Sequence, residues 1–280
     1  MALLVKNLSK SFWRRDVGDL QVLSGIDLEV EDGEFVCILG PTGCGKSTFL
    51  NIIAGLEQPD AGEVWIDDRK AQGLSRDRML LFQEPSLFPW LTVLENVEFA
   101  LKFKNISKQE IKQHSLEILK KVHLGRFINA FPHELSTGMK QRVAIARALV
   151  SNPKILLMDE PFGLVDGQTR ILLHLELQEI WQETKKTILF VTGSVEEAVC
   201  LADKLYVFSK RPGRIIKKYQ IDYPRPRRET DKNLIDLENN IMQLLSCEIE
   251  KVVKEEVDIE YTISKDGVLC PIDRNLGSNI

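Results

Sequence analysis

Residues 33–54, GEFVCILGPTGCGKSTFLNIIA, decide the fold. The run FVCIL is short and entirely apolar, which is typical of a β-strand buried on both faces. The segment from Gly40 to Ser47 then has the pattern G-x-x-x-x-G-K-S, and the apolar residues from Phe49 to Ile53 have helical spacing. An isolated match to this pattern would be an ordinary glycine turn. The order of strand, loop and helix instead predicts a loop that binds phosphate groups.

The physical chemistry of this loop predicts a nucleotide site. Glycines allow successive backbone N–H groups to turn towards a phosphate chain, and the following helix adds the partial positive charge of its N-terminus. Lys46 is expected to reach the β- and γ-phosphates, and the Ser47 hydroxyl is expected to bind Mg²⁺. The nucleotide-binding residues predicted here are Gly40, Pro41, Thr42, Gly43, Cys44, Gly45, Lys46, Ser47 and Thr48.

A pair of acidic residues follows a second apolar run. Residues 154–162 read KILLMDEPF, so Asp159 and Glu160 come at the end of a predicted buried strand. A lone acidic pair in this position is usually a helix N-cap. Together with the phosphate loop upstream, it predicts that Asp159 binds Mg²⁺ and that Glu160 polarises a water molecule for attack on the γ-phosphate.

Composition excludes several classes of protein. The chain has 280 residues, of which 44% are hydrophobic, and a formal net charge of −4, which argues against a dedicated nucleic-acid-binding protein. No apolar run approaches the roughly 18 residues of a membrane span, and the N-terminus lacks the basic region of a signal peptide. The five cysteines are scattered without metal-ligand spacing, which is typical of a reducing cytosol.

Residues 135–147, LSTGMKQRVAIAR, carry a family resemblance. The segment is similar to the signature LSGGQ-QR, and the chain resembles the nucleotide-binding subunit of an ATP-binding cassette (ABC) transporter. Thr137 stands where glycine is commonest. The resemblance implies that Ser136 and Gly138 contact the γ-phosphate held by a second cassette, so that ATP lies between two subunits. A serine and a glycine that open a helix do offer donors to an anion.

Other residues typical of the family can be identified one at a time in this sequence. The resemblance implies that Phe12 stacks on adenine, with Trp13 as the neighbouring candidate, and that Gln83 contacts Mg²⁺ and couples to a membrane subunit. Asp166 corresponds to an aspartate that faces the opposite subunit, although the two residues before it differ from the usual Ala-Leu. The predicted catalytic residues are then Glu160, Gln83 and Lys46, and the predicted metal ligands are Ser47, Gln83 and Asp159.

One expected residue is missing. Residues 190–198 read FVTGSVEEA, where the family normally has V-T-H-D, so Gly193 replaces a histidine that contacts the γ-phosphate and Ser194 replaces the aspartate. None of the four histidines of the chain, His114, His123, His133 and His174, is at this position. The resemblance therefore implies a degenerate switch loop that leaves nucleotide binding intact and removes one polar contact to the transition state.

The resemblance implies an α/β P-loop NTPase fold, an ABC cassette with a mainly parallel core sheet, an antiparallel β subdomain and a helical subdomain. The cassette is predicted to span residues 1–228, with early strands at 2–8, 20–31 and 62–68 and the helical subdomain at about 87–150. The basic run 211–228 is expected to be a solvated strand and linker. Residues 229–280 are predicted to form a C-terminal extension, an amphipathic helix and a small hairpin that turns at Lys265–Gly267.

Three functions remain open from the sequence. The favoured one is an ATPase subunit at the cytoplasmic face of the cell membrane, peripheral, that energises an importer of the nitrate/sulfonate/taurine branch, which the segment RPGRIIKKYQIDYPRPR resembles. Its implied partners are a second cassette in a homo- or heterodimer, transmembrane permease subunits and, indirectly, a solute-binding protein. The second is an ATP-dependent clamp without hydrolysis. The third, a cassette protein of translation or repair, usually has two cassettes or a long coiled coil.

The segment EPSLFPWLTVLENV, residues 84–97, is rich in large apolar side chains beside Gln83. Exposed aromatic residues mark partner sites more often than random surface does. We expect it to line a groove that receives a helix of the membrane subunit, and the alternative is a local apolar core.

Overall fold

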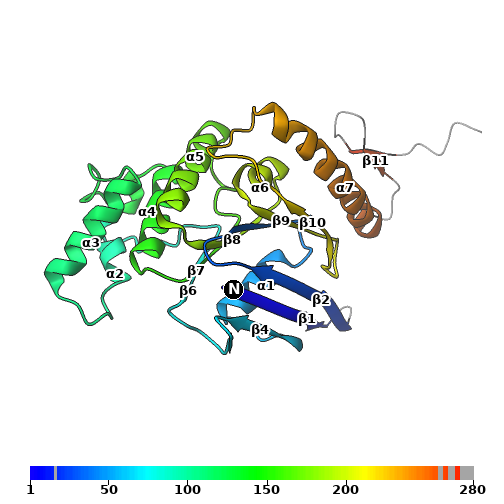
Figure 1. Cartoon of the computed structure of the whole chain (residues 1–280), viewed down its shortest axis with the longest axis horizontal. Helices are drawn as coiled ribbons and strands as arrows, with labels where there is room; N and C mark the ends of the chain where they lie inside the picture. The colour runs from blue at the N-terminus through cyan, green and yellow to red at the C-terminus, as the bar shows by residue number, and fades with distance from the viewer. Residues whose placement is uncertain (16–17, 258–260, 264–268, 272–280) are drawn as a thin grey trace, which may run out of the picture.

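A six-stranded sheet forms the centre of the molecule, in a computed structural model that describes residues 1–15, 18–257, 261–263 and 269–271 (Figure 1). The strand order is β10-β9-β3-β8-β7-β6, and every pair is parallel except β9 with β10. The strands are β3 (Phe35–Leu39), β6 (Arg78–Leu81), β7 (Ile155–Asp159), β8 (Thr187–Thr192), β9 (Lys204–Phe208) and β10 (Ile215–Gln220). The prediction of a mainly parallel core sheet is therefore confirmed.

Strand β3 is buried on both faces because it lies between two apolar cores. Phe35 and Cys37 point into a core that helices cover, whereas Val36 and Ile38 point into a second core with helix α1 (Lys46–Ala54). Successive side chains of a strand alternate between its faces, so a strand with a core on each side must be apolar throughout. The phosphate loop therefore follows a fully buried and rigid strand.

A second, antiparallel sheet packs on the α1 side, below the central sheet in Figure 1. Its order is β2-β1-β4-β5, from β1 (Leu3–Arg14), β2 (Gly18–Val30), β4 (Ala61–Ile66) and β5 (Arg69–Lys70). The expected end of the first strand at residue 8 is wrong, since β1 continues to Arg14, and from Lys10 onward it pairs with β2 alone. Irregularities in the register after Val5 let the strand bend as it leaves β4.

The helical region lies at one side of the central sheet, at the left in Figure 1. It contains α2 (Val93–Phe99), α3 (Lys108–Lys121), a 3-10 turn (Pro132–Glu134) and α4 (Thr137–Val150). Capping boxes at Thr92 with Glu95 and at Ser107 with Glu110 start α2 and α3, because each pair satisfies backbone N–H groups of the first turn. Helices α5 (Gly167–Thr184) and α6 (Val195–Leu201) then cover the helical face of the central sheet.

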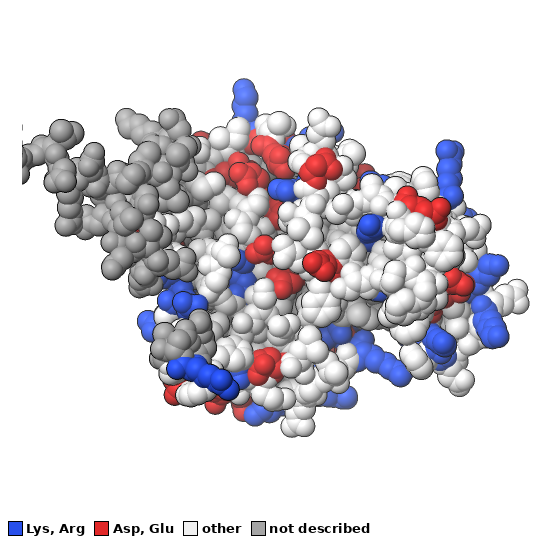
Figure 2. Space-filling view, turned by 180° about the vertical axis from the view of Figure 1, so that it is seen from behind, with Lys and Arg blue, Asp and Glu red and all other residues white. Residues whose placement is uncertain are grey.

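The surface carries charges of both signs. Figure 2 shows Asp and Glu side chains interspersed with Lys and Arg side chains over the face behind that of Figure 1. This face is therefore not the continuous basic surface that nucleic-acid-binding proteins present. In the part of the chain that the structure describes, no helix is both long and apolar enough to cross a bilayer.

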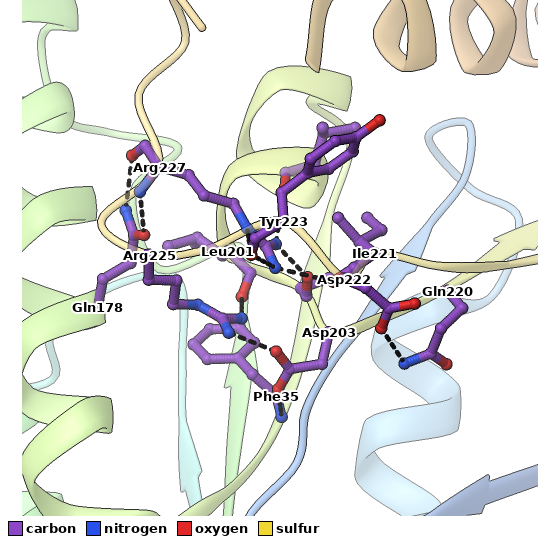
Figure 3. A network of polar contacts seen from close by, with 12 residues as sticks. Phe35, Gln178, Leu201, Asp203, Gln220, Ile221, Asp222, Tyr223, Arg225 and Arg227 are labelled. Atoms are coloured by element: carbon purple, nitrogen blue, oxygen red, sulfur yellow. Dashed lines mark hydrogen bonds and ion pairs between the residues drawn. The ribbon is translucent and has the colours of Figure 1, made fainter. Parts of the chain in front are cut away.

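The basic linker after β10 turns inward, contrary to the expectation of a solvated segment. Arg227 is only 1% exposed, and its guanidinium donates to four backbone carbonyls, those of Val199, Ala202, Ile221 and Tyr223 (Figure 3). Arg225 pairs with Asp203 and donates to the Leu201 carbonyl. The side-chain amide of Gln178 bonds with the backbone of Arg227 in both directions. Arginines are tolerated here because the last carbonyls of α6 need donors.

The C-terminal extension begins with helix α7 (Lys232–Val257), which packs on α6. Leu234, Ile241 and Leu245 are buried by this contact, at the spacing of one helix face. Short strands β11 (Tyr261–Ile263) and β12 (Leu269–Pro271) pair antiparallel. The predicted turn at Lys265–Gly267 lies outside the described residues.

One acid of α7 is expected to make stability depend on pH. Burial, with help from the charges of Glu196 and Glu229, raises the pKa of Glu238 from 4.5 to about 7. The folded state then keeps a proton that the unfolded state has lost, so stability falls as pH rises from about 4.5 to about 7. Glu238→Gln should raise the Tm at about pH 8 by roughly 2–4 °C, for about 1 kcal/mol after solvent screening.

Thermal unfolding at about pH 4.5 and about pH 8 checks this expectation. Asp236→Asn, at an exposed acid of the same helix, is the matched control and should not give a gain confined to high pH. Equal Tm differences for Glu238→Gln at the two pH values would contradict the assignment.

Candidate nucleotide site

The phosphate loop connects the end of β3 to the start of α1. Gly45 has a φ of +107°, and a Cβ placed on it would lie 2.8 Å from a methyl group of Leu23, so both conformation and space require glycine there. Cys44 is buried beneath the loop, with its sulfur where a Cβ on Gly40 would meet it. The antiparallel sheet, through Leu23, thus supports the loop from below.

Lys46 reaches back into its own loop. Its ammonium donates to the carbonyls of Gly40 (2.8 Å) and Pro41 (3.1 Å) and lies 3.3 Å from Oε1 of Glu160. The side chain is 5% exposed. A buried cation held against carbonyls and one carboxylate is well placed to accept the negative charge of a phosphate group in their stead.

Ser47 and Asp159 form the candidate metal site. The Ser47 hydroxyl donates to Oδ1 of Asp159 at 3.0 Å, and Glu160 is the next residue. Burial raises the pKa of Asp159 and the Glu160 charge adds to the rise, whereas the Ser47 hydrogen bond and the Lys46 charge oppose it. Hard oxygen donors at a carboxylate that lacks solvation fit Mg²⁺, which also takes phosphate oxygens. The described residues contain no group of three His, Cys, Asp or Glu side chains suited to a metal ion.

The residues expected at the γ-phosphate meet at the carboxyl ends of β7 and β8. The Glu160 amide donates to the Val191 carbonyl at 2.9 Å, and a Cβ built on Gly193 would have Glu160 Oε1, at 4.0 Å, as its nearest neighbour. Gln83 is exposed after β6, and its Nε2 would lie 3.1 Å from a Cβ on Gly163. The structure therefore brings Gly193 and Gln83 to the loop that carries Glu160.

The signature residues lie elsewhere, on the first turn of α4. Ser136 is the exposed N-cap and accepts from the amide of Met139 at 3.3 Å. Gly138 is buried, and a Cβ there would come within 2.5 Å of the Thr169 methyl group, whereas Thr137 is exposed and has room for its side chain. Ser136 thus bonds within α4 and Gly138 lies against α5, and the role of both towards a second subunit stays a prediction.

Asp166 and Phe12 occupy exposed positions. Asp166 caps α5 by accepting from the Thr169 amide at 3.0 Å, and this hydrogen bond lowers the pKa of its carboxyl. Phe12 lies on β1 opposite Leu20, is 36% exposed, and has the Lys10 ammonium 5.0 Å from its ring centroid. The stacking of Phe12 on adenine stays a prediction.

The segment 84–97 is part core and part surface, since Val93 and Val97 are buried in the helical core and Trp90 is exposed, and its docking role stays a prediction. Asn96, fully buried, exchanges hydrogen bonds with the backbone of Phe88 and also donates to the carbonyls of Leu91 and Thr92. This clamp leaves Trp90 70% exposed. A groove of about 740 Å³ begins at Leu91 and runs between α2 and α3. Burial raises the pKa of Glu98 at its wall.

Sequence reasoning did not find the polar residues that support the loop at Gly193. Glu197 and His174 are both buried and lie 3.0 Å apart, between α6 and α5. The second glutamate of SVEEA could have signalled this pair, since a carboxylate on the inward face of a short helix needs a donor. Which donor it meets depends on the packing of α5.

Comparisons with known proteins agree with this geometry. Residues 23–163 match the family described as ABC transporter. An uncharacterized ABC transporter ATP-binding protein of Methanocaldococcus jannaschii is 46% identical over 252 residues, which cover 90% of this chain and 94% of that protein. The nitrate import ATP-binding protein NrtD of Synechocystis sp. is 46% identical, with 83% and 87% covered. The aliphatic sulfonates import ATP-binding protein SsuB of Bacillus anthracis is 40% identical, with 87% and 95% covered.

Solved structures are similar as well. The dimeric structure of MJ0796, described as a bacterial ABC transporter cassette, has a TM-score of 0.70 and 36% identity, and the match covers 79% of this chain and 100% of that one. A post-hydrolysis state of the same cassette, bound to ADP and Pi, has a TM-score of 0.69.

Proposed function

The chain belongs to the ABC transporter ATP-binding family and is an ATPase of that class, and from this premise we propose that it energises the import of a small anionic or organic solute. The observation that carries the proposal is the convergence of Lys46, Ser47, Asp159 and Glu160 at one end of the central sheet. Two relatives named for nitrate and sulfonate import, at 46% and 40% identity, support the branch.

We assign each residue a role from its contacts. Lys46 would leave the Gly40 and Pro41 carbonyls to pair with the β- and γ-phosphates, which the loop amides also bind. This movement would free Glu160 from the lysine, so that its carboxylate can orient a water molecule and take its proton. Ser47, Asp159 and Gln83 would hold Mg²⁺, which when bound neutralises charge on the phosphate oxygens.

A second copy of a cassette would complete the site. Ser136 and Gly138 lie at the first turn of α4, where Ser136 is exposed, Gly138 is buried beside it and the helix N-terminus is available to an anion. We propose that they contact the γ-phosphate held by the partner cassette and that Asp166 faces the same interface. The partner would be a second copy of this chain or a different cassette.

The groove beside Trp90 would receive a helix from transmembrane permease subunits, so that the cassette works at the cytoplasmic face of the membrane. A solute-binding protein would supply the solute to those subunits. The clamped backbone at Phe88–Thr92 keeps the groove open in advance of binding, which lowers the entropic cost of docking.

Trp90→Glu is expected to abolish co-purification of the cassette with its permease subunits, and with it solute-stimulated ATP hydrolysis. The reason is that a buried interface aromatic often contributes about 2 kcal/mol or more, and a carboxylate in its place adds desolvation cost. Leu74→Glu, at a residue of similar exposure (73%), is the matched control and should leave assembly intact. If the Trp90 variant assembles as the native chain does, the docking proposal fails.

One observation favours a second candidate function. Gly193 offers no side chain to the γ-phosphate, so a homodimer of this chain would lack the same contact in both sites. Such a dimer would close on ATP and hydrolyse it slowly, as a clamp or regulatory subunit. In a heterodimer, a partner with an intact histidine would hydrolyse ATP against Ser136 and Gly138 of this chain.

A further inference from the structure

A chain of buried polar contacts leads from the Gly193 loop to the middle of α5. The amide of Ser194 donates to the Thr192 hydroxyl oxygen at 2.9 Å, and the Thr192 hydroxyl donates to Oε2 of Glu197 at 2.5 Å. The other carboxylate oxygen, Oε1, lies 3.0 Å from Nε2 of His174. Contacts of this kind link both neighbours of Gly193 to one imidazole.

Burial makes these contacts strong determinants of geometry. Thr192 and His174 are each 2% exposed and Glu197 is 5% exposed. A carboxylate at this depth needs donors, and the side-chain donors described for Glu197 are the Thr192 hydroxyl and the His174 ring. The amide of Glu197 also donates to Ser194 Oγ at 3.1 Å. The loop therefore has few alternative positions.

Gly193, at the centre of the loop, has no side chain that could fix the position of the loop. A Cβ on Gly193 would find Glu160 Oε1 at 4.0 Å and no closer neighbour, so no side-chain packing holds residue 193 in place. Its position relative to Glu160 must come from the residues on either side, Thr192 and Ser194.

His174 also touches the loop that follows Glu160. Its ring centroid lies 5.5 Å from that of Phe162, and its Nδ1 lies 3.4 Å from Oε1 of Glu229. The same imidazole thus contacts the Glu160 loop through Phe162, the Gly193 loop through Glu197, and Glu229 in the segment before α7. No other described histidine has contacts with both loops.

We propose that His174 is a positioning residue, which through Glu197 and Thr192 holds the Gly193 loop at a fixed distance from Glu160. The inference rests on the proposed hydrolytic role of that loop only for its effect on turnover. The effect on loop geometry is independent of it, so the two can fail separately.

Hydrogen exchange of peptides that span residues 190–198 measures the loop directly. His174→Leu removes the ring nitrogens and keeps an apolar side chain, and the Ser194 amide should then exchange at least about tenfold faster because its opening is less costly. Peptides from β3 and β7 should exchange as in the native chain. His174→Gln, whose amide can still donate to Glu197, should restore most of the protection.

Leu173→Ala is the matched control, since Leu173 is an equally buried neighbour on α5 outside the polar chain. If it accelerates the loop as His174→Leu does, the effect is loss of packing and the proposal is overturned. Native exchange of residues 190–198 in His174→Leu overturns it as well. Should His174→Leu not fold, Glu197→Gln tests the same link with an unchanged shape and should also accelerate exchange.

Turnover supplies the second readout. In a chain that carries Gly193→His and Ser194→Asp, His174→Leu should lower kcat about tenfold with a KM for ATP within about twofold, because a misplaced catalytic group loses rate and not binding. Faster loop exchange without any rate gain from Gly193→His would refute the hydrolytic role of the loop and leave the positioning role standing. A KM for ATP that rises as much as kcat falls would show that nucleotide binding is disturbed as well, and it would overturn the positioning role in catalysis.

Discussion

Lys46→Ala is expected to lower the affinity of the chain for ATP by about 100-fold or more, which corresponds to about 3 kcal/mol of binding free energy. The ammonium is 5% exposed and is aimed into the phosphate loop by the carbonyls of Gly40 and Pro41. Each charge-assisted hydrogen bond that it transfers to a phosphate oxygen is worth about 1.5–3 kcal/mol. Alanine would also leave Glu160 without its cation.

Equilibrium binding of a fluorescent ATP analogue to the purified chain measures this effect. Lys121→Ala is the control, since Lys121 pairs with Glu183 at 2.7 Å on the surface and is 44% exposed. It should bind nucleotide as the native chain does. An unchanged affinity in a folded Lys46→Ala chain would rule out the phosphate-loop assignment.

Gly193→His, combined with Ser194→Asp, is expected to raise ATP turnover of the purified homodimer at least about tenfold. A positioned acid–base or transition-state contact contributes roughly 10²–10⁴ in rate, or about 2.7–5.5 kcal/mol of barrier. The side chain has room, since the first atom of the new residue would meet only Glu160 Oε1 at 4.0 Å. The new histidine side chain would therefore begin next to Glu160, the residue with which it must act in hydrolysis.

The second substitution preserves the start of α6. Ser194 is the N-cap and accepts from the Glu197 amide at 3.1 Å, and aspartate caps helices as well as serine does. ATP affinity should change little, because Lys46 and the loop amides are untouched. Gly193→Ala is the control that adds a Cβ without an imidazole, and its turnover should stay low. If the histidine chain is no faster than the alanine chain, the hydrolytic role of residue 193 is refuted: another residue supplies the contact, or the loop is not arranged as the family resemblance implies.

Much of the fold was predictable because its signals are local. FVCIL and ILLM are apolar without alternation, which is typical of strands with a core on each face, so two buried strands were predicted there and are confirmed. The phosphate loop was equally clear, because its pattern contains Gly45, where a φ of +107° and the lack of space for a Cβ require glycine. The boundary of β1 was not, because residues 9–14 lack the apolar run of the first half of the strand, and they extend it by pairing with β2 across a short turn.

The candidate site also has residues that the sequence could predict and residues that it could not. The phosphate-loop pattern alone predicted the roles of Lys46 and Ser47, and the structure places both against the two acids at the end of β7. The contacts of Glu197 with His174 were not predictable, because α5 and α6 meet only through the packing of the whole sheet. Arg225 and Arg227 were misread for a related reason. A run of basic residues suggests solvent exposure, yet the carbonyls that end α6 turn this one inward.

The C-terminal extension is attached to the cassette by two arginines, Arg225 and Arg227, which restrict its movement. Arg225 and Arg227 bind the residues before α7 to Gln178 of α5, to the end of α6 and to Asp203 just before β9, and α7 itself packs on α6. Among the cysteine side chains that the structure describes, Cys247 on this helix is the exposed one, whereas Cys37, Cys44 and Cys200 are buried. A spectroscopic label on Cys247 would therefore travel with the cassette, and the distance between two such labels would follow the opening and closing of the dimer during each cycle.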